Sequence, residues 1–340
     1  MTAPFQIFDP LLAASEAEAM LRLCERFGRY LTYAEDVTAA EPFAPEIPQR
    51  YDAAANFVRT GGRFGRREDP GVLASRTNYF RATYAYDRPE TPGIEPFLFY
   101  EGFLAGARAI HGRPHVVPNI VYANLLLPGQ ELAVHTDVPE FRGANRKRFP
   151  QWLIVVMHHS GLFDRWRMPI ATGVAYFGGC RGGEFAFYPE GPEGAARTLP
   201  VKHNTAVILD TDSVFHGVDR VAETVPLPAV RPGASLEFVP GNGAWQLRSE
   251  SGEPLARYDF GELRFSVSWK AYCYADEAER RLAETHEDDL ALGFILERLE
   301  ADLRARGRLA GARPPEDKDF ALLLIDEYVR FPEPRRANDA

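Results

Sequence analysis

Short apolar runs, separated by Gly, Pro and Asp, fill the chain from about residue 115 to residue 274. In order they are HVVPNIVYANLLL, QWLIVVMHHS, GVAYFGG, GEFAFYP, TAVILDTDSVFHGV, SLEFV, AWQLRS, LARYDF and LRFSVSWKAYCY. Evenly spaced runs with no helical period between them are typical of strands in an all-β sandwich or barrel. We therefore predict a mainly β core over residues 116–275.

Helical periodicity is found on both sides of this core. Residues 10–30 predict an amphipathic helix with Ser15 as a capping residue, and residues 93–112 predict a second helix. Residues 32–88 have no clean period and are interpreted as loops and short strands. After the core, two further helices joined through RPPED are expected over 276–307 and 317–331.

The expected organisation is one domain over residues 1–275 and a C-terminal helical extension over 276–340. Within the domain, residues 1–115 supply helices and a lid, and residues 116–275 form the core. The length allows one large domain or one domain with an appendage. The extension is expected to pack on or beside the core, and its apolar stretch ALLLIDEYVRF suggests a homodimer through these helices.

Composition narrows the class of protein. A net charge of −9 offers no overall cationic surface for nucleic acid or an anionic membrane. The N-terminus lacks a basic region followed by a long apolar run, so no signal peptide is expected. The three cysteines, Cys24, Cys180 and Cys273, are odd in number and far apart. This spacing argues against a disulfide or zinc-finger framework and favours a cytoplasmic protein.

Two short segments carry candidate metal ligands. In LLLPGQELAVHTDVPEFRG, His135 and Asp137 stand two apart where a strand ends, and alternate residues of a strand project to the same face. His216 follows another apolar run. A polar turn and a surface histidine are the ordinary alternatives. Two histidines and one carboxylate make a facial triad, which is typical of non-haem Fe(II) sites, although zinc can use the same ligands.

A third segment, LRFSVSWKAY, places Arg264 and Ser266 on one face of a predicted strand. A buried arginine needs an anionic partner, and its planar fork suits a carboxylate. That carboxylate could belong to a ligand or to an internal salt bridge.

In this order, HxD, His and RxS, the motifs resemble the Fe(II)/2-oxoglutarate-dependent dioxygenase superfamily. The resemblance covers about residues 116–274 and includes RGGEFAFYP, which looks like the Gly-Gly-Glu strand of prolyl-hydroxylase-like members. It implies a double-stranded β-helix, or jelly-roll, core with flanking N- and C-terminal α-helices.

The resemblance also implies cofactors and roles. His135, Asp137 and His216 would bind Fe(II), while Arg264 and Ser266 would hold the distal carboxylate of 2-oxoglutarate. O2 would be the second cosubstrate, and succinate and CO2 would be released. Related halogenases have a small residue in place of the carboxylate ligand, so the presence of Asp137 favours hydroxylation or another non-halogenating oxidation.

Further candidates for the cosubstrate follow from the same comparison. Tyr122 and Asn124 alternate on the strand before HxD, where superfamily members often contact 2-oxoglutarate; core packing is the alternative. The interval from His216 to Arg264 is long and looks like an inserted hairpin region. Arg220, in HGVDRV, is therefore a rival for the cosubstrate carboxylate.

Substrate contacts are expected from three segments. SRTNYFRATYAY offers Arg76 and Asn78, together with a tyrosine and Arg81. The basic stretch after HxD begins with Arg142 and suggests an anionic substrate, with a solvated loop as the alternative. His158 is placed on a predicted strand, where it and the next histidine would face opposite ways, so that one lines the pocket.

The favoured function is a hydroxylase acting on an amino acid, a peptidyl side chain or, by preference, a small metabolite. A cupin-like metalloprotein that does not use 2-oxoglutarate is the second hypothesis, and it requires an internal salt bridge at Arg264. A non-catalytic β-sandwich binding protein is the third, and it requires no metal affinity.

Overall fold

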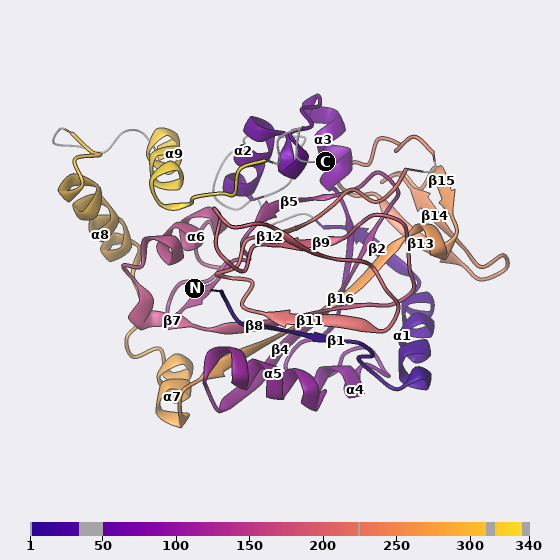
Figure 1. Cartoon of the computed structure of the whole chain (residues 1–340), viewed down its shortest axis with the longest axis horizontal. Helices are drawn as coiled ribbons and strands as arrows, with labels where there is room; N and C mark the ends of the chain where they lie inside the picture. Colours follow the sequence, from indigo (N-terminus) through magenta and orange to yellow (C-terminus); the bar gives the residue numbers. More distant parts are fainter. Residues whose placement is uncertain (1, 34–49, 224, 311–316, 335–340) are drawn as a thin grey trace.

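The computed structural model describes residues 2–33, 50–223, 225–310 and 317–334 (Figure 1). Within these ranges the helices are α1 (Ala14–Phe27), α2 (Tyr51–Thr60), α3 (Pro70–Thr77), α4 (Glu95–Leu98), α5 (Glu101–His111), α6 (Gln151–Ser160), α7 (Glu277–Thr285), α8 (Leu292–Ala305) and α9 (Asp317–Tyr328). The strands are β1 (Phe5–Phe8), β2 (Arg29–Thr32), β3 (Phe80–Ala85), β4 (His115–Leu126), β5 (Leu132–His135), β6 (Glu140–Phe141), β7 (Arg167–Met168), β8 (Ile170–Tyr176), β9 (Phe185–Phe187), β10 (Arg197–Leu199), β11 (Thr205–Leu209), β12 (His216–Val218), β13 (Ser235–Val239), β14 (Ala244–Arg248), β15 (Pro254–Tyr258) and β16 (Arg264–Tyr274).

Two antiparallel sheets form the core. The larger has ten strands in the order β1-β11-β8-β16-β4-β3-β2-β13-β14-β15, and the smaller has four in the order β10-β9-β12-β5. Eight of these strands pair in a nested way along the chain: β4 with β16, β5 with β12, β8 with β11, and β9 with β10. Nested pairing across two facing sheets is the topology of a jelly roll. The predicted mainly β, jelly-roll core with flanking helices is confirmed.

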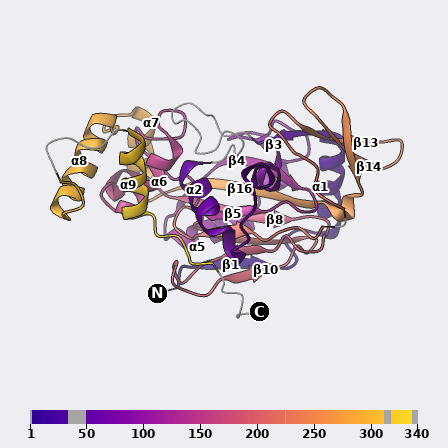
Figure 2. The same ribbon diagram turned by 90° about the horizontal axis from the view of Figure 1, so that it is seen from above.

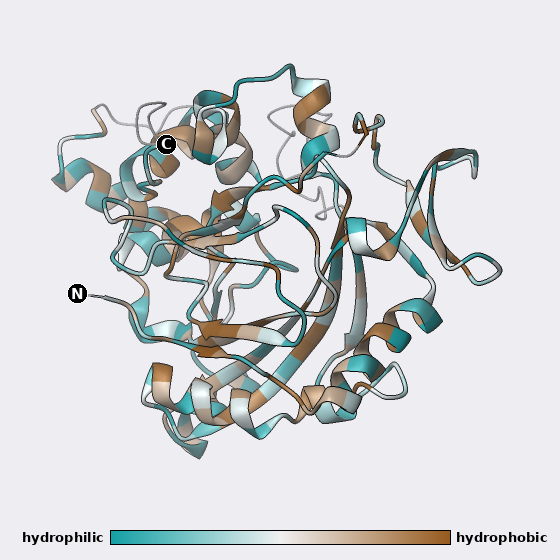
Figure 3. Ribbon diagram, turned by 45° about the vertical axis from the view of Figure 1, so that its right-hand side comes forward, coloured by the Kyte–Doolittle hydropathy of each residue, from teal (hydrophilic) through white to brown (hydrophobic). Residues whose placement is uncertain are grey.

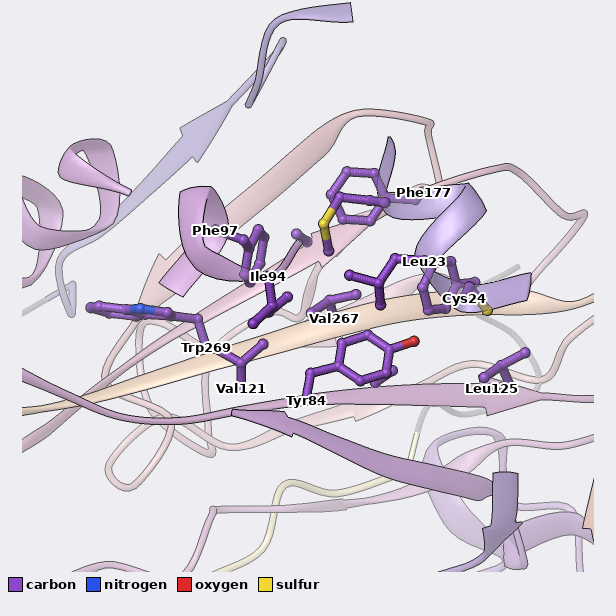
Figure 4. Close-up of a cluster of buried hydrophobic side chains, with 14 of the residues drawn as sticks. Leu23, Cys24, Tyr84, Ile94, Phe97, Val121, Leu125, Phe177, Val267 and Trp269 are labelled. Atoms are coloured by element: carbon purple, nitrogen blue, oxygen red, sulfur yellow. The ribbon is translucent and has the colours of Figure 1, made fainter. Parts of the chain in front are cut away.

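The large sheet has an apolar outer face. On β16, Phe265, Val267 and Trp269 belong to the main hydrophobic cluster, whereas the residues between them line an internal cavity. This alternation follows from the two-residue period of a strand. Figure 4 shows Val267 and Trp269 packed near Phe97 and Ile94, which come from the segment containing α4. The indole of Trp269 also donates a hydrogen bond to the carbonyl of Leu98 at 2.8 Å, which ties the end of α4 to the sheet.

Helix α1 covers the same face. It buries Ala17, Met20, Leu23 and Cys24, at the spacing of one helical stripe, and its polar and apolar stretches alternate in Figure 3. The helix begins after Ala13, whose N–H donates to the side chain of Glu16 at 3.1 Å, so the prediction that Ser15 caps it is wrong.

The segment Gln151–Ser160 was expected to be a strand, but it is helix α6. Its five central residues, Leu153 to Met157, are all buried. A helix buried on every side shows no amphipathic period, so its short run of apolar residues cannot be told from a strand by pattern alone. Residues 51–60 and 70–77, expected as loops and short strands, are helices α2 and α3; residues 34–49 of the same prediction lie outside the described residues.

The first helix expected after the core is two helices, α7 and α8. The break includes His286, whose φ of 59° is incompatible with a continuous α-helix. Most of the RPPED connection lies outside the described residues. Helices α8 and α9 share a hydrophobic cluster with α6. They lie at one end of the molecule, and strands β13–β15 lie at the other (Figures 1 and 2).

The long interval between β12 and β16 contains the meander β13–β15, which extends the large sheet through β2. The three cysteines are free thiols. Within the described ranges, the chain has no helix that combines the length and apolar character needed to cross a membrane.

Candidate active site

A cavity of about 500 Å³ lies between the two sheets. From the large sheet it is lined by Tyr122 and Asn124 of β4 and by the polar face of β16. His135, Phe185 and His216 of the small sheet form the facing wall. The polar residues of β16 are Arg264, Ser266, Ser268, Lys270 and Tyr272.

Strand pairing brings the predicted metal ligands together. His135 ends β5, His216 begins β12, and the two residues are direct cross-strand partners with ring centroids 4.5 Å apart. Asp137 lies two residues after His135. Its Oδ1 is 3.7 Å from Nε2 of His135 and 3.8 Å from Nε2 of His216. One donor atom from each residue lies within 4.8 Å of the others, close enough to share one ion.

Hydrogen bonds aim the histidine donors inward. Nδ1 of His135 lies 2.7 Å from the carbonyl of Ala133, and Nδ1 of His216 lies 2.9 Å from the carbonyl of Val214. A carbonyl can only accept, so each Nδ1 carries the proton and each Nε2 presents its lone pair. Burial, with the charge of His135, lowers the pKa of His216 to about 3. The imidazole of His216 is therefore neutral near pH 7, as metal binding requires.

The carboxylate of Asp137 is held at one oxygen. Its Oδ2 accepts hydrogen bonds from Thr211 Oγ1 at 2.6 Å and from Lys270 Nζ at 2.7 Å. Burial acts to raise the pKa of Asp137, but Lys270 and the two histidines outweigh it and keep that pKa well below its usual range. Oδ1 stays available beside the two Nε2 atoms. Two neutral nitrogens and one carboxylate oxygen fit a divalent metal in a facial triad.

Arg264 lies in the same cavity and is buried. Its Nε donates to the carbonyl of Gly183 at 2.7 Å, and its Nη1 donates to Ser266 Oγ at 3.0 Å. In the described part of the chain, no carboxylate lies within ion-pair distance of this guanidinium. The internal salt bridge required by the cupin-like hypothesis is therefore not found among these residues.

Arg220 is placed differently. It does not line the cavity, and its Nε lies 2.9 Å from Glu131 Oε1 while its Nη2 lies 2.9 Å from Glu68 Oε2. Two carboxylates thus already neutralise this arginine, which leaves Arg264 as the stronger candidate for a ligand carboxylate.

Tyr122 and Asn124 both reach the cavity. Asn124 is the direct cross-strand neighbour of Ser266. Its Oδ1 accepts a hydrogen bond from Arg81 Nε at 3.0 Å, and the Tyr122 ring lies 3.8 Å from the centre of the same guanidinium. Both residues are thus also partners of Arg81, so their contact with 2-oxoglutarate stays a prediction.

No protein-family model matches the chain, and no curated protein matches it in sequence. The solved structures that it is similar to include prolyl hydroxylases and a member of the 2-oxoglutarate–Fe(II) oxygenase family. A prolyl-4-hydroxylase from Pseudomonas putida is 11% identical, with 81% of this chain and 94% of that chain covered and a TM-score of 0.39.

Two further structures give similar values. A prolyl hydroxylase from Trichoplax adhaerens, solved with a hypoxia inducible factor peptide fragment, is 12% identical, with 83% and 87% covered and a TM-score of 0.44. HygX from Streptomyces hygroscopicus, solved with nickel, 2-oxoglutarate and hygromycin B, is 12% identical, with 80% and 84% covered and a TM-score of 0.39. Similarities this weak carry no functional argument, so the function has to be inferred from the residues of this chain.

Of the residues predicted to contact substrate, Arg76, Asn78, Arg142 and His158 do not line the cavity, whereas Tyr79 and Arg81 do. Arg76 pairs with Glu68 and Glu223, both at 2.6 Å, and Arg142 pairs with Asp288 at 2.7 Å. The remaining two are likewise held elsewhere: Asn78 Nδ2 donates to the carbonyl of Val230 at 2.9 Å, and His158 Nε2 lies 3.1 Å from Ser213 Oγ. The argument that His158 and His159 face opposite ways also fails, because both lie on helix α6.

Sequence reasoning missed Lys270 and Thr211, the partners of Asp137. Lys270 could have been found by extending the alternation of LRFSVSWKAY, since every second residue from Arg264 to Lys270 is polar. Thr211 gives no such signal, because its contact with Asp137 depends on how the segment before β12 meets the end of β5.

Proposed function

We propose that this protein is an Fe(II)- and 2-oxoglutarate-dependent oxygenase that hydroxylates a small molecule. One observation carries the proposal. A two-histidine, one-carboxylate cluster shares a cavity with a buried arginine that has no carboxylate partner among the described residues. The cluster can hold a metal with open positions, and the arginine supplies the countercharge for an acidic cosubstrate.

His135, Asp137 and His216 would hold the iron. When bound there with 2-oxoglutarate, Fe(II) supplies the activation of O2 for oxidation of a C–H bond, with release of succinate and CO2. Arg264 would bind the distal carboxylate of 2-oxoglutarate, with Ser266 Oγ adding a hydrogen bond. Held in this way, the cosubstrate would have its opposite end available to the metal.

Other residues shape the site. Lys270 and Thr211 hold Asp137 Oδ2, so that only Oδ1 is presented to the metal. Phe185, Val174 and Val218 give the cavity apolar walls, which exclude water around the reacting groups. The presence of a carboxylate at residue 137 supports hydroxylation over halogenation.

A small substrate is favoured because the cavity, at about 500 Å³, is in the range of small-molecule sites and must also hold the cosubstrate. An amino acid or a peptidyl side chain remains within the proposal. The division into 1–275 and 276–340, the cytoplasmic location and a homodimer through the C-terminal helices stay predictions; light scattering on the full chain tests the dimer.

Turnover of 2-oxoglutarate tests the proposal. Protein loaded with Fe(II) in air should convert 2-oxoglutarate to succinate and CO2, with a higher rate when a substrate is present. Asp137→Ala should abolish this activity. Arg264→Gln should raise the KM for 2-oxoglutarate at least tenfold, because charged hydrogen bonds contribute about 1.5–3 kcal/mol and about 1.4 kcal/mol is tenfold.

Arg220→Gln provides the comparison, and its KM should stay near that of the wild type once thermal unfolding shows that the variant is folded. The proposal is wrong if, with every compound tested, the iron-loaded wild type forms no more succinate than Asp137→Ala. It is also wrong if Arg264→Gln leaves the KM unchanged.

A further inference from the structure

Another arginine of the cavity has an unusual environment. Arg81, on β3, has its guanidinium carbon 4.0 Å from the centroid of the Tyr33 ring and 3.8 Å from that of the Tyr122 ring. Its Nε donates to Asn124 Oδ1 at 3.0 Å. With a third ring, Tyr79, whose centroid lies 5.8 Å away, three cation–π contacts and one hydrogen bond hold this side chain in place.

The outer edge of the guanidinium is open. Within the described ranges, the two terminal nitrogens of Arg81 have no hydrogen-bond or carboxylate partner. Neither nitrogen is completely shielded from solvent. The side chain is half-buried and lines the cavity that holds the metal ligands. With aromatic rings packed against the guanidinium, the terminal N–H groups are what Arg81 offers to a ligand, and two parallel N–H groups match a carboxylate.

Arg81 and Arg264 cannot both be needed for 2-oxoglutarate. Arg81, Asn124 and Ser266 are cross-strand neighbours in one row, so β4 separates the strand of Arg81 from that of Arg264. Two strand spacings amount to about 10 Å. The cosubstrate has one carboxylate for a guanidinium, because its other carboxylate is used at the metal. Arg264 is the more deeply buried of the two and has Ser266 beside it.

The other charged side chains of the cavity also bear on what Arg81 can bind. Among the described lining residues, Lys270 is paired with Asp137, and Glu140 accepts a hydrogen bond from Tyr272 at 2.7 Å. Asp137, which Lys270 already neutralises, acts on Arg81 only at a distance, and no cavity carboxylate among the described residues lies within ion-pair distance of Arg81. An arginine that lines the cavity without an ion-pair partner among the described residues points to an anionic ligand.

We infer that the primary substrate is a carboxylic acid, and that the edge of Arg81 binds its carboxylate and positions the carbon to be oxidised. This inference rests on the proposed function. The same fork of N–H groups can bind two oxygens of a phosphate, so phosphate esters are the competing ligands that the test has to separate from carboxylic acids. Neutral substrates and phosphate esters are therefore outcomes that would contradict it.

The test measures succinate release from 2-oxoglutarate with paired probes. The probes are the free L-amino acids and the C3–C6 dicarboxylic acids, each with its primary amide, together with the matching phosphate esters of hydroxy compounds. We expect at least one acid to stimulate turnover at least tenfold more than its amide. In Arg81→Gln, the KM for that acid should rise at least tenfold, while the KM for 2-oxoglutarate should stay within twofold of wild type.

Two variants make the result specific. Arg81→Lys keeps the charge without the planar fork and should recover part of the affinity for the acid. Arg88→Gln removes an exposed arginine that follows β3 outside the cavity, and it should behave as the wild type. The unchanged KM for 2-oxoglutarate shows that the Arg81 variants are folded.

Several results would overturn the inference. These are stimulation only by amides or phosphate esters, an unchanged KM for the acid in Arg81→Gln, no response to any acid, or a loss of 2-oxoglutarate affinity in Arg81→Gln as large as in Arg264→Gln. Failure of the proposed function is a different result: the wild type would then form no succinate from 2-oxoglutarate with any probe.

Discussion

Lys270 and Asp137 form a charged pair inside the cavity, with 2.7 Å between Nζ and Oδ2. Placing either charge alone in a buried site is costly, whereas the pair compensates both. The carboxylate gains a fixed orientation from this contact. Because Lys270 is on β16 and Asp137 follows β5, the pair also joins the two sheets at the metal site.

Replacing Lys270 should weaken metal binding. In Lys270→Met the pKa of Asp137 should rise, because burial raises it and the opposing ammonium is gone. The carboxylate then takes up a proton at a higher pH, and metal is released at a higher pH than from wild type. We expect Fe(II) or Mn(II) affinity at pH 7 to fall about 10- to 100-fold, measured by anaerobic titration between pH 5 and 8.

Lys147→Met serves as the control, since Lys147 is exposed at the edge of the cavity and makes no ion pair with a described residue. Equal metal affinity and equal pH dependence in Lys270→Met and wild type would show that Lys270 does not orient the ligand.

At the scale of elements, the loop before β9 supports Arg264. Gly182 and Gly183 have φ of +71° and +70°, in the left-handed region that favours glycine. A Cβ on Gly183 would lie 2.9 Å from Cδ of Arg264, and the Gly183 carbonyl accepts the Arg264 Nε–H. Gly183 is therefore explained by the arginine that it holds, whereas a Cβ on Gly182 would meet the backbone oxygen of Arg220 at 2.5 Å.

Gly183→Ala should displace Arg264 and weaken 2-oxoglutarate binding while leaving metal affinity near that of wild type. We expect the KM for 2-oxoglutarate to rise about tenfold, because loss of a charged hydrogen bond costs about 1.5–3 kcal/mol. Gly179→Ala is the matched control, since a Cβ there meets only Val201 O at 3.8 Å. A Gly183→Ala protein with unchanged KM would mean that the loop does not position Arg264.

Site residues and elements are best predicted from the sequence where their signal is local. His135 and Asp137 share a short segment, and His216 also ends an apolar run, so the ligand pattern was visible before the strands were paired. Helix α6 was mistaken for a strand because burial on all sides removes its period. Whether such a segment forms a helix or a strand depends on its tertiary packing and not on its local pattern.

At the scale of the whole molecule, the C-terminal helices are tied to the loop that follows the metal ligands. Arg142, in that loop, donates to both oxygens of Asp288 at 2.7 and 2.9 Å and is buried. The partners are 146 residues apart. Such distance explains why Arg142 looked like a free basic residue in the sequence: its acidic partner could not be identified without the fold.

Asp288→Asn should loosen this connection by leaving Arg142 without its countercharge. We expect the free energy of unfolding to fall by about 2 kcal/mol at pH 7, measured by denaturant unfolding. The hydrogen bond from Arg142 lowers the pKa of Asp288. The contribution is therefore complete above the ordinary aspartate pKa of about 3.9 and is lost as the pH falls through the lowered value.

The difference between variant and wild type should accordingly shrink as the pH falls below about 4. Glu297→Gln, at an exposed residue of α8, should leave the free energy of unfolding unchanged both at pH 7 and below about pH 4. A pH-independent difference for Asp288→Asn would show that the charge of Asp288 is not what holds the helices.

Anaerobic binding of Fe(II) and 2-oxoglutarate tests the central claim most directly. Wild-type protein should develop the weak visible charge-transfer band of the Fe(II)–2-oxoglutarate chelate. The band should be absent in Asp137→Ala and should require at least tenfold more 2-oxoglutarate in Arg264→Gln. Wild-type protein that binds iron but gives no band at saturating 2-oxoglutarate would contradict the assignment of this cavity.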